Sequence, residues 1–407
     1  MTALAPPLTY AAQWRGRPTI AVVDLDVLAG NVRALRSIIG PKVRLMAVVK
    51  ANGYGHGAIP TGKAALAAGA DELAVATVDE GAQMRRAGVT APVLVLGPIG
   101  VAERPEVIGH GLGVVVSDAS FAHGLAADAK MMLAKEPVSV HLKIDTGMHR
   151  FGVESGLVVA TAQAIAQHPE LRLDGVMTHM SSADAPDPAT THEQNAIFDR
   201  CLAELHAAGI ETTGHHSANS ATTLRFPEYR RDRVRVGVAI HGLRPDTDFA
   251  LPGPLTPTMT IHSRLSRIHE LQVGEGVSYG LTYRASGPER VGLLPMGYGD
   301  GFRRALSSRT WVAIDGKRAD QLGRICMDQM VVRVPEGVEG ATGDLVTVVG
   351  NGTAATGPAP TMDELAALVD SISYDMSTSL TPRLTRLYVR GGEIVAVADL
   401  SGYRELV

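Results

Sequence analysis

Residues 43–57 read Val43-Arg44-Leu45-Met46-Ala47-Val48-Val49-Lys50-Ala51-Asn52-Gly53-Tyr54-Gly55-His56-Gly57. The first half is a nearly unbroken apolar run, which predicts a strand buried on both faces. Lys50 closes this strand and is followed by a glycine-rich loop. An amine at the end of an apolar strand is poorly hydrated, which lowers its pKa and makes the nucleophilic form accessible. We therefore consider Lys50 as a Schiff-base lysine. The ordinary alternative is a strand-end lysine that extends into water.

The same pattern continues along the first part of the chain. Helical patterns rich in alanine and leucine separate the apolar runs, for example at residues 58–68, 79–86, 119–133, 156–167 and 193–208. Strands buried on both faces and separated by helices favour a parallel sheet. Eight such units favour an α/β fold of the (β/α)8 TIM-barrel type over an open doubly wound sheet. The predicted strands are 43–50, 72–77, 93–96, 112–116, 138–145, 173–179, 212–217 and 233–236.

The sequence pattern changes after Leu243-Arg244-Pro245. Pro252, Pro254 and Pro257 follow and indicate a linker. Beyond it, short β-rich runs alternate with glycine turns, which predicts a mainly antiparallel C-terminal β-domain. The runs are 258–273, 291–296, 311–314, 329–334 and 345–349, with one helix at 362–372. We expect a tail at 1–18, the barrel at 19–245 and the β-domain at 246–407. The apolar run 19–23 is one strand too many for the barrel, so we assign it to the second domain.

The length, net charge and cysteine count of the chain limit its possible functions. The chain has 407 residues and a net charge of -4, which gives no reason to expect nucleic acid or an anionic membrane as a partner. Only two cysteines, Cys201 and Cys326, occur, and neither lies in a metal-spaced pattern. Residues 1–18 lack a signal-peptide pattern, and no run approaches the roughly 18 apolar residues of a membrane span. We predict a cytoplasmic protein without a metal.

Polar residues collect at the predicted C-terminal ends of the strands, where a barrel places its active site. Each has an ordinary alternative: a strand-end histidine is more often structural, and Arg235 could be an ion-pair partner. Together they favour a ligand site. In chain order they are Lys50, Lys143, Asp145, His179, His216, Asn219, Ser220, Arg235 and Gly237.

Three features suggest a phosphate on the ligand. Ser220 lies in a loop entering a helix, where a hydroxyl and free amides receive anions. Gly237 follows the last strand and allows close backbone approach. Tyr54, after Lys50, offers a phenol. A phosphate-bearing aldehyde opposite a lysine is pyridoxal phosphate. The spacing of Gly53, Gly55 and Gly57 does not fit a dinucleotide motif.

Seven short stretches of sequence, in a fixed order along the chain, together resemble one known family. They are residues 48–57, 143–150, 217–220, 235–238, 277–283, 295–301 and 323–329. These blocks closely resemble those of alanine racemases, which are pyridoxal-phosphate enzymes with a barrel and a C-terminal β-domain. The resemblance implies interconversion of L- and D-alanine by two-base proton transfer on an external aldimine. Lys50 would be one base, and Tyr279 from the other subunit of a homodimer would be the second. The D-alanine would supply peptidoglycan precursors, with D-alanine catabolism left open.

The resemblance also assigns roles to further residues. Arg150 would contact the substrate carboxylate, assisted by the backbone N–H of Met327. A network of His179, Arg235 and His216 would favour the Tyr279 phenolate, and Arg235 would face the pyridine nitrogen. The implied cofactor-binding residues are Lys50, Tyr54, His179, Asn219, Ser220, Arg235, Gly237, Val238 and Tyr374. The implied supporting residues are Lys143 as a possible carbamate, His216, Tyr298, Asp328, Arg304 and Arg324, with Ile372 at the entrance.

Alternatives remain at this point. His149 stands where glycine or asparagine is expected, and Gly53 where alanine is usual, so a substrate range including serine or larger or basic amino acids stays open. A related decarboxylase and a non-catalytic barrel that binds the cofactor leave the Tyr279 block unexplained. A metal hydrolase using His179, His215 and His216 lacks a paired carboxylate and leaves Lys50 unexplained.

Overall fold

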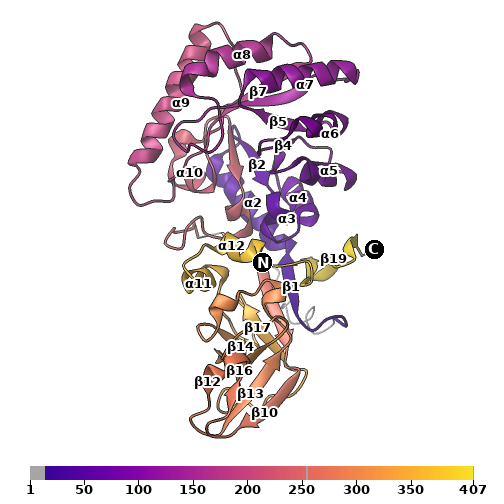
Figure 1. Ribbon diagram of the computed structural model, residues 1–407, viewed down its shortest axis with the longest axis vertical. Helices are drawn as coiled ribbons and strands as arrows, with labels where there is room; N and C mark the ends of the chain where they lie inside the picture. The colour runs from indigo at the N-terminus through magenta and orange to yellow at the C-terminus, as the bar shows by residue number, and fades with distance from the viewer. Residues whose placement is uncertain (1–13, 254, 407) are drawn as a thin grey trace.

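The computed structural model describes residues 14–253 and 255–406. Most of the expected tail at 1–18, and Pro254 of the expected linker, lie outside the described residues. The molecule is elongated, with a barrel at one end and a β-domain at the other (Figure 1). This arrangement confirms the predicted fold class, an α/β barrel followed by a mainly antiparallel β-domain.

The barrel sheet is parallel, in the order β7-β6-β5-β4-β3-β2-β8. Its strands are short runs of valine, leucine and alanine whose side chains are almost all buried, as strands covered by helices require. They are β2 (Arg44–Val48), β3 (Glu72–Val75), β4 (Val93–Val95), β5 (Gly113–Val116), β6 (Val138–Lys143), β7 (Leu171–Met177) and β8 (Arg233–Val236). The helices are α2 (Leu25–Ile39), α3 (Lys50–Tyr54), α4 (Ala58–Ala67), α5 (Val78–Arg86), α6 (Arg104–Gly109), α7 (Ala119–Met131), α8 (Val158–Ala166), α9 (Ala189–Ala207) and α10 (Ser220–Arg225).

The expected strand at 212–217 is the one barrel strand that does not form regularly. Gly214 adopts φ 64°, and the amide of His215 donates to the Asp232 carboxylate instead of a neighbouring strand. The following residues still bridge the gap between β7 and β8. The His216 amide donates to the Val176 carbonyl at 3.0 Å, and the Arg235 amide donates to the Ala218 carbonyl at 3.0 Å. The barrel therefore closes through an irregular segment.

The second sheet has eleven strands, in the order β10-β13-β16-β15-β14-β17-β9-β1-β18-β19-β20. The run expected at 258–273 divides into two strands at Leu265 and Ser266, and each half joins a different part of the sheet. The strands are β1 (Ile20–Asp24), β9 (Met259–Arg264), β10 (Arg267–Leu271), β13 (Glu289–Leu294), β14 (Trp311–Ile314), β15 (Lys317–Leu322), β16 (Met330–Arg333), β17 (Leu345–Val349), β18 (Thr385–Arg390), β19 (Glu393–Asp399) and β20 (Gly402–Glu405), with a separate hairpin of β11 (Gly276–Val277) and β12 (Tyr283–Arg284).

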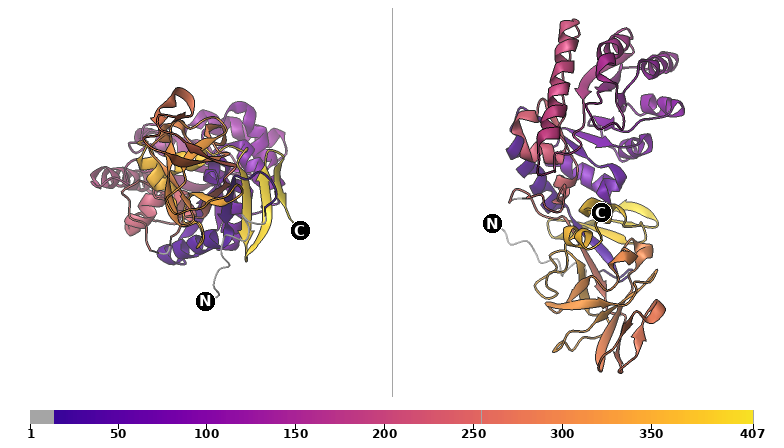
Figure 2. Two further views of the ribbon diagram at one scale, coloured as in Figure 1. Left: turned by 90° about the horizontal axis from the view of Figure 1, so that it is seen from below. Right: turned by 60° about the vertical axis from the view of Figure 1, so that its left-hand side comes forward.

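The ends of the chain meet in this second sheet. Strand β1 is parallel to β18 and antiparallel to β9, so an N-terminal strand lies inside the C-terminal domain (Figure 2). Asp24 at its end accepts the amides of Asp26 and Val27 and so caps α2 of the barrel. The chain therefore enters the barrel from the other domain.

Two short helices lie between the domains in Figure 1. The helix expected at 362–372 ends early, as α11 (Met362–Ala367), and Asp370 has a positive φ of 52°. The chain then starts α12 (Ser373–Thr378), which carries Tyr374. None of the described helices is both long enough and apolar enough to span a membrane.

Candidate active site

One pocket lies at the C-terminal ends of the barrel strands and gathers most of the residues predicted from the sequence. They come from the ends of β2, β6, β7 and β8, from the segment that closes the barrel, and from α12. A barrel places these strand ends around one rim, although they are far apart in the chain. The predicted residues in its lining are Lys50, Tyr54, Lys143, Arg150, His179, Asn219, Ser220, Arg235, Gly237, Val238 and Tyr374.

Lys50 starts a short turn of unusual hand. The backbone of Ala51, Asn52 and Gly53 is left-handed, with φ of 51°, 53° and 61°. The Asn52 side chain accepts the Ala58 amide at 3.0 Å and ties the turn to the start of α4. Burial, and after it the nearby Arg150 cation, lower the pKa of the Lys50 amine. The lysine therefore has the environment that favours a nucleophilic amine.

A small cradle lies beside this turn. The Gly237 amide donates to the Ser220 hydroxyl at 3.2 Å, and Asn219 caps α10, which Ser220 begins. A Cβ atom at residue 237 would lie 2.3 Å from the Tyr54 hydroxyl oxygen, so the Tyr54 phenol can approach this backbone only because the residue is glycine. The Tyr374 ring completes this side, with its centroid 6.3 Å from that of Tyr54. Hydroxyl groups and a glycine backbone thus converge, as an anion site requires.

Arg235 is buried and held by two imidazoles. It donates from Nη1 to Nδ1 of His216 at 2.8 Å and from Nη2 to Nδ1 of His179 at 3.1 Å. The same two nitrogens also donate to carbonyls of residues 178, 216 and 217, whereas its Nε–H has no hydrogen bond to a described residue. Burial lowers the pKa of Arg235 to about 9, so the guanidinium stays charged at neutral pH. One donor of this cation remains for a ligand.

The network continues to a histidine that the sequence did not single out. His141 lies in the middle of β6, and its Nδ1 is 2.8 Å from Nε2 of His216. Because Nδ1 of His216 accepts from Arg235, the proton of this imidazole lies on Nε2 and is donated to His141. Burial lowers the pKa of His216 well below its ordinary value and that of His141 to about 3. Both imidazoles are therefore neutral.

The pocket is strongly cationic. Its lining carries four basic side chains, Lys50, Lys143, Arg150 and Arg235, against the single carboxylate of Asp184. Burial, and then Arg150, lower the pKa of Lys143 to about 8, and its amine lies 4.4 Å from the centre of the Phe151 ring. Such a pocket attracts a ligand with more than one negative group.

The loop that carries Arg150 is ordered by Asp145. Its carboxylate accepts the amides of Gly147 at 3.0 Å and His149 at 3.1 Å. His149 has φ 53°, a conformation that glycine and asparagine adopt more readily. Its side chain is 85% exposed and does not line the pocket. His149 therefore belongs to the exposed loop and does not form part of the pocket wall.

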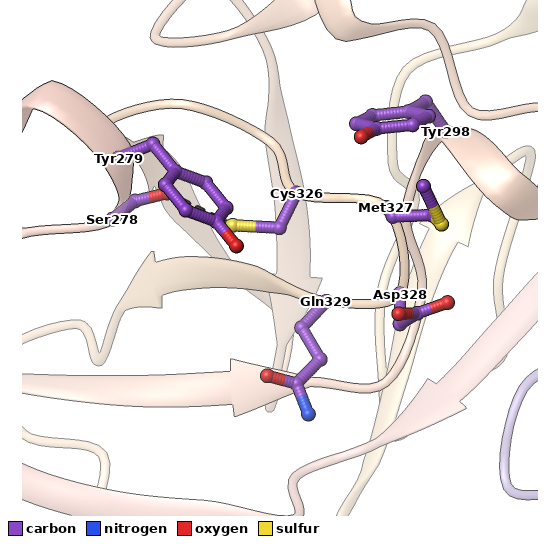
Figure 3. A pocket seen from close by; sticks show the side chains of 7 residues that line it. All are labelled: Ser278, Tyr279, Tyr298, Cys326, Met327, Asp328 and Gln329. Atoms are coloured by element: carbon purple, nitrogen blue, oxygen red, sulfur yellow. Dashed lines mark hydrogen bonds between the residues drawn. The ribbon is translucent and has the colours of Figure 1, made fainter.

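A second concavity, on the C-terminal domain, holds four further predicted residues, Tyr279, Tyr298, Met327 and Asp328 (Figure 3). It is lined by Ser278, Tyr279, Tyr298, Cys326, Met327, Asp328 and Gln329 and shares no residue with the barrel pocket. Tyr279 is 72% exposed and Met327 52% exposed. Figure 3 shows the rings of Tyr279 and Tyr298 on opposite sides of this concavity.

Arg383 orders the rim of this concavity. It donates to the Asp328 carboxylate at 2.6 Å, to the buried Asp300 at 2.8 Å and to the Met327 carbonyl at 3.2 Å. Arg304, Arg324 and Ile372 line neither concavity in the single chain. Arg324 lies against Gly280, where a Cβ would be 2.8 Å from its Nη1.

Sequence reasoning missed the apolar wall of the barrel pocket and one carboxylate. The wall residues are ordinary strand-end apolar residues, which no local pattern distinguishes from core; they are Val48, Ala76, Leu96, Met148, Phe151, Met177 and Met180, and the carboxylate is Asp184. The three histidines of the metal-hydrolase alternative do not converge. His179 and His216 accept from Arg235, while His215 bonds Thr212 at 2.8 Å. Within the described residues no three histidine, cysteine or acidic side chains could hold a metal ion.

Comparison with known proteins agrees with the resemblance. The family model "Alanine racemase, N-terminal domain" matches residues 23–245, and "Alanine racemase, C-terminal domain" matches residues 258–388. Both halves of the chain are therefore matched by models of one family.

Individual relatives match over almost their whole length. An alanine racemase of Symbiobacterium thermophilum is 41% identical over 93% of this chain and 98% of its own. Alanine racemase 2 of Bacillus subtilis is 37% identical over 92% of this chain and 96% of its own. The crystal structure of alanine racemase from Bacillus anthracis with bound L-Ala-P superposes with a TM-score of 0.87 at 33% identity, covering 94% of this chain and 98% of that one. A histidine racemase from Leuconostoc mesenteroides has a TM-score of 0.84 at 24% identity, which shows the shared fold alone.

Proposed function

Since the chain belongs to the alanine racemase family, we propose that it interconverts L-alanine and D-alanine with pyridoxal 5′-phosphate as cofactor. The observation that carries the proposal is the barrel pocket, where an amine of lowered pKa, an anion cradle and a buried arginine meet. Each of these groups matches a different part of the cofactor.

The residues present fit this group. The cradle of Ser220, Gly237 and Tyr54 would suit a phosphate, since two hydroxyl groups meet there and only glycine at 237 lets the Tyr54 phenol lie against the backbone. Tyr374 and the backbone of Val238 would complete the phosphate contacts, with Asn219 holding Ser220 in place. Lys50 would hold the aldehyde carbon. The unpartnered Nε–H of Arg235 would face the ring nitrogen. When bound, the cofactor would supply an electron-withdrawing ring that acidifies the α-hydrogen of an amino acid.

The permanent charge of Arg235 would affect how strongly the cofactor ring withdraws electrons. A guanidinium gives up its proton far less readily than a carboxylic acid, so it offers the ring nitrogen a hydrogen bond without protonating it. This moderates the electron demand at the α-carbon. We propose that Arg235 would in this way limit side reactions of the bound amino acid.

The substrate carboxylate has a clear partner. Arg150 is exposed in the pocket, and no described side chain pairs with its guanidinium. Lys143 lies close enough to influence it, because the Arg150 charge contributes to the lowered pKa of Lys143. A neutral amine reacts with carbon dioxide, and we propose that Lys143 carries a carbamate whose negative charge orients Arg150. An arginine that binds a carboxylate in two places fixes the α-carbon for proton transfer.

Racemisation needs a proton-transfer group on each face of the α-carbon. Lys50 would act on one face. The second base that the family resemblance implies, Tyr279, lies in the other concavity of the same chain. We therefore propose a homodimer in which Tyr279 and Met327 of a second copy complete each pocket.

His179 would prepare Tyr279 for this role. Its Nδ1 accepts from Arg235, so its proton lies on Nε2, free to donate to an incoming phenolate. Burial lowers the pKa of His179 well below its ordinary value, so the imidazole stays neutral. A hydrogen bond from a neutral imidazole to a phenolate favours that charged form.

The test is an assay of optical inversion on a panel of L-amino acids, read by chiral chromatography. Alanine should be turned over fastest, as membership of the family predicts. Wild-type protein should show the visible absorption of bound cofactor, and borohydride reduction should fix it on Lys50.

Lys50→Ala should abolish both the absorption and the activity. Lys63→Ala is the matched control, because Lys63 pairs with Glu405 at the surface, 2.8 Å away, and lines neither concavity. A colourless wild-type protein after incubation with cofactor would count against the assignment. Faster turnover of serine or of a basic amino acid would instead indicate a different substrate specificity within the same family.

We also propose that the protein works in the cytoplasm. Cys201 and Cys326 are both free thiols, which suits a reducing compartment. D-Alanine made there would enter peptidoglycan precursors.

A further inference from the structure

A single carboxylate joins the loop after Lys50 to the neighbouring strand–helix loop. Oε1 of Glu80 accepts the Ala51 amide at 2.6 Å, and Oε2 accepts the amides of Ala76 at 2.7 Å and Thr77 at 3.3 Å. Lys50 and Ala76 both line the barrel pocket. Glu80 itself lies in the first turn of α5 and is only partly buried. Its two oxygens thus connect two parts of the pocket wall.

The turn held in this way is strained. Ala51 and Asn52 adopt the left-handed conformation, which an alanine in particular rarely takes because its Cβ approaches the following carbonyl oxygen. Such a conformation persists only when contacts from outside determine it. Here a charged group acts at each end. Glu80 accepts the amide that opens the turn, and Nε of the buried Arg386 donates to the Gly55 carbonyl that closes it, at 2.7 Å.

We propose that Glu80 is a positioning residue for Lys50. By fixing the Ala51 amide, its carboxylate sets the direction in which the preceding lysine leaves the backbone. This inference rests on the proposed function, in which the lysine amine both holds the cofactor and transfers a proton. A displacement of about 1 Å at such a group is enough to slow catalysis severely. The negative charge also opposes the effect of burial on the Lys50 pKa.

The chain contains a matched control. Thr361 and Glu364 form the same capping box as Thr77 and Glu80. Oε2 of Glu364 accepts the Thr361 amide at 2.7 Å, and this carboxylate has no hydrogen bond to another element of the described chain. Glutamine preserves a capping box because one oxygen is sufficient. At position 80 both oxygens are used, so the glutamine NH2 group would face a backbone N–H.

The experiment compares Glu80→Gln and Glu364→Gln as holoenzymes. Hydrogen exchange of the peptide 49–57 should become about tenfold faster in Glu80→Gln, as expected from losing one charge-assisted hydrogen bond. The kcat for alanine should fall about tenfold, with KM changed less than about twofold, because positioning acts on the chemical step. Glu364→Gln should leave exchange and kcat unchanged, and both variants should retain a similar Tm.

Unchanged hydrogen exchange of the peptide 49–57 in Glu80→Gln would show that Glu80 does not hold the turn after Lys50. Faster exchange with an unchanged kcat, or an equal loss of kcat in both variants, would overturn the positioning role. If wild-type protein neither binds cofactor nor racemises alanine, the proposed function fails, while the exchange measurement still decides whether Glu80 holds the turn.

Discussion

At the scale of single residues, the buried arginine determines what its neighbours can do. Arg235 donates to Nδ1 of both His179 and His216, which places the proton of each imidazole on Nε2. His216 passes its proton to His141, and His179 keeps an Nε2–H for another acceptor. One cation thereby fixes two tautomers, and only one of the two imidazoles remains available to a phenolate.

Replacing Tyr279 tests the division of labour between the two proposed bases. Because the equilibrium constant between enantiomers is one, kcat/KM must fall equally in both directions, by about 10²- to 10⁴-fold for loss of an acid/base group. The asymmetry lies in exchange with solvent. In deuterium oxide, Tyr279→Phe should still incorporate deuterium into D-alanine through Lys50 and lose incorporation into L-alanine.

Mass spectrometry of each recovered enantiomer measures that difference. Tyr229→Phe serves as the control, since the Tyr229 hydroxyl pairs with His192 at 2.7 Å and the residue lines neither concavity. Equal loss of incorporation into both enantiomers in Tyr279→Phe would contradict a two-base mechanism.

At the scale of elements, the strand ends could be predicted from sequence because their signals are local. Lys50 follows the end of β2, and Lys143 and Arg235 lie at or next to the last residue of β6 and β8. A barrel brings such strand ends to one rim. The carbonyl and amide partners of the irregular strand at 212–217 could not be predicted, because they depend on Gly214 and on the distant Asp232.

Other elements of the site also lack a local signal. The left-handed turn after Lys50 includes Ala51, and alanine alone favours other conformations. Glu80 and Arg386, which hold it, are 29 and 331 residues from their partners. His141 is hidden in a strand whose pattern is otherwise that of core. Long-range contacts, rather than propensity, set these features.

Gly53 gives a prediction about this turn. It has φ 61°, and an added Cβ would lie 2.7 Å from Oγ1 of Thr61. Gly53→Ala should therefore destabilise the protein by about 1–2 kcal/mol through backbone strain, with more from the clash. Urea unfolding measures this change in the free energy of unfolding.

The control for that substitution is Gly30→Ala in α2, where no atom lies within 4 Å of the new Cβ. Alanine in a helix should stabilise by about 0.5–1 kcal/mol. Gly53→Ala with unchanged stability would show that the turn relaxes out of the left-handed region.

At the scale of the whole molecule, the two domains meet at the proposed cofactor site. Helix α12 brings Tyr374 to the barrel pocket, and Arg386 of β18 donates to the turn that carries Lys50 and Tyr54. The second concavity, with Tyr279, is separate from the barrel pocket in the same chain, since the two share no lining residue. The proposed catalytic set is therefore complete only between two copies.

Mixed dimers test this sharing. In a dimer of one Lys50→Ala chain and one Tyr279→Phe chain, one pocket carries both defects and the other has an intact lysine and an intact tyrosine. Equal mixing makes half of the dimers mixed, each with one working pocket of two, so activity should recover to about a quarter of the wild-type value. Subunits are exchanged by dissociation and dilution, and native mass spectrometry measures the mixed dimers.

The matched control mixes two variants from the same concavity. Lys50→Ala and Arg150→Gln both alter the barrel pocket, so every pocket of their mixed dimer keeps one defect and activity should not recover. The comparison separates a shared site from general stabilisation by mixing, which would act on both pairs alike. Mixed dimers of the first pair that form and stay inactive would show that Lys50 and Tyr279 do not serve the same pocket from different chains.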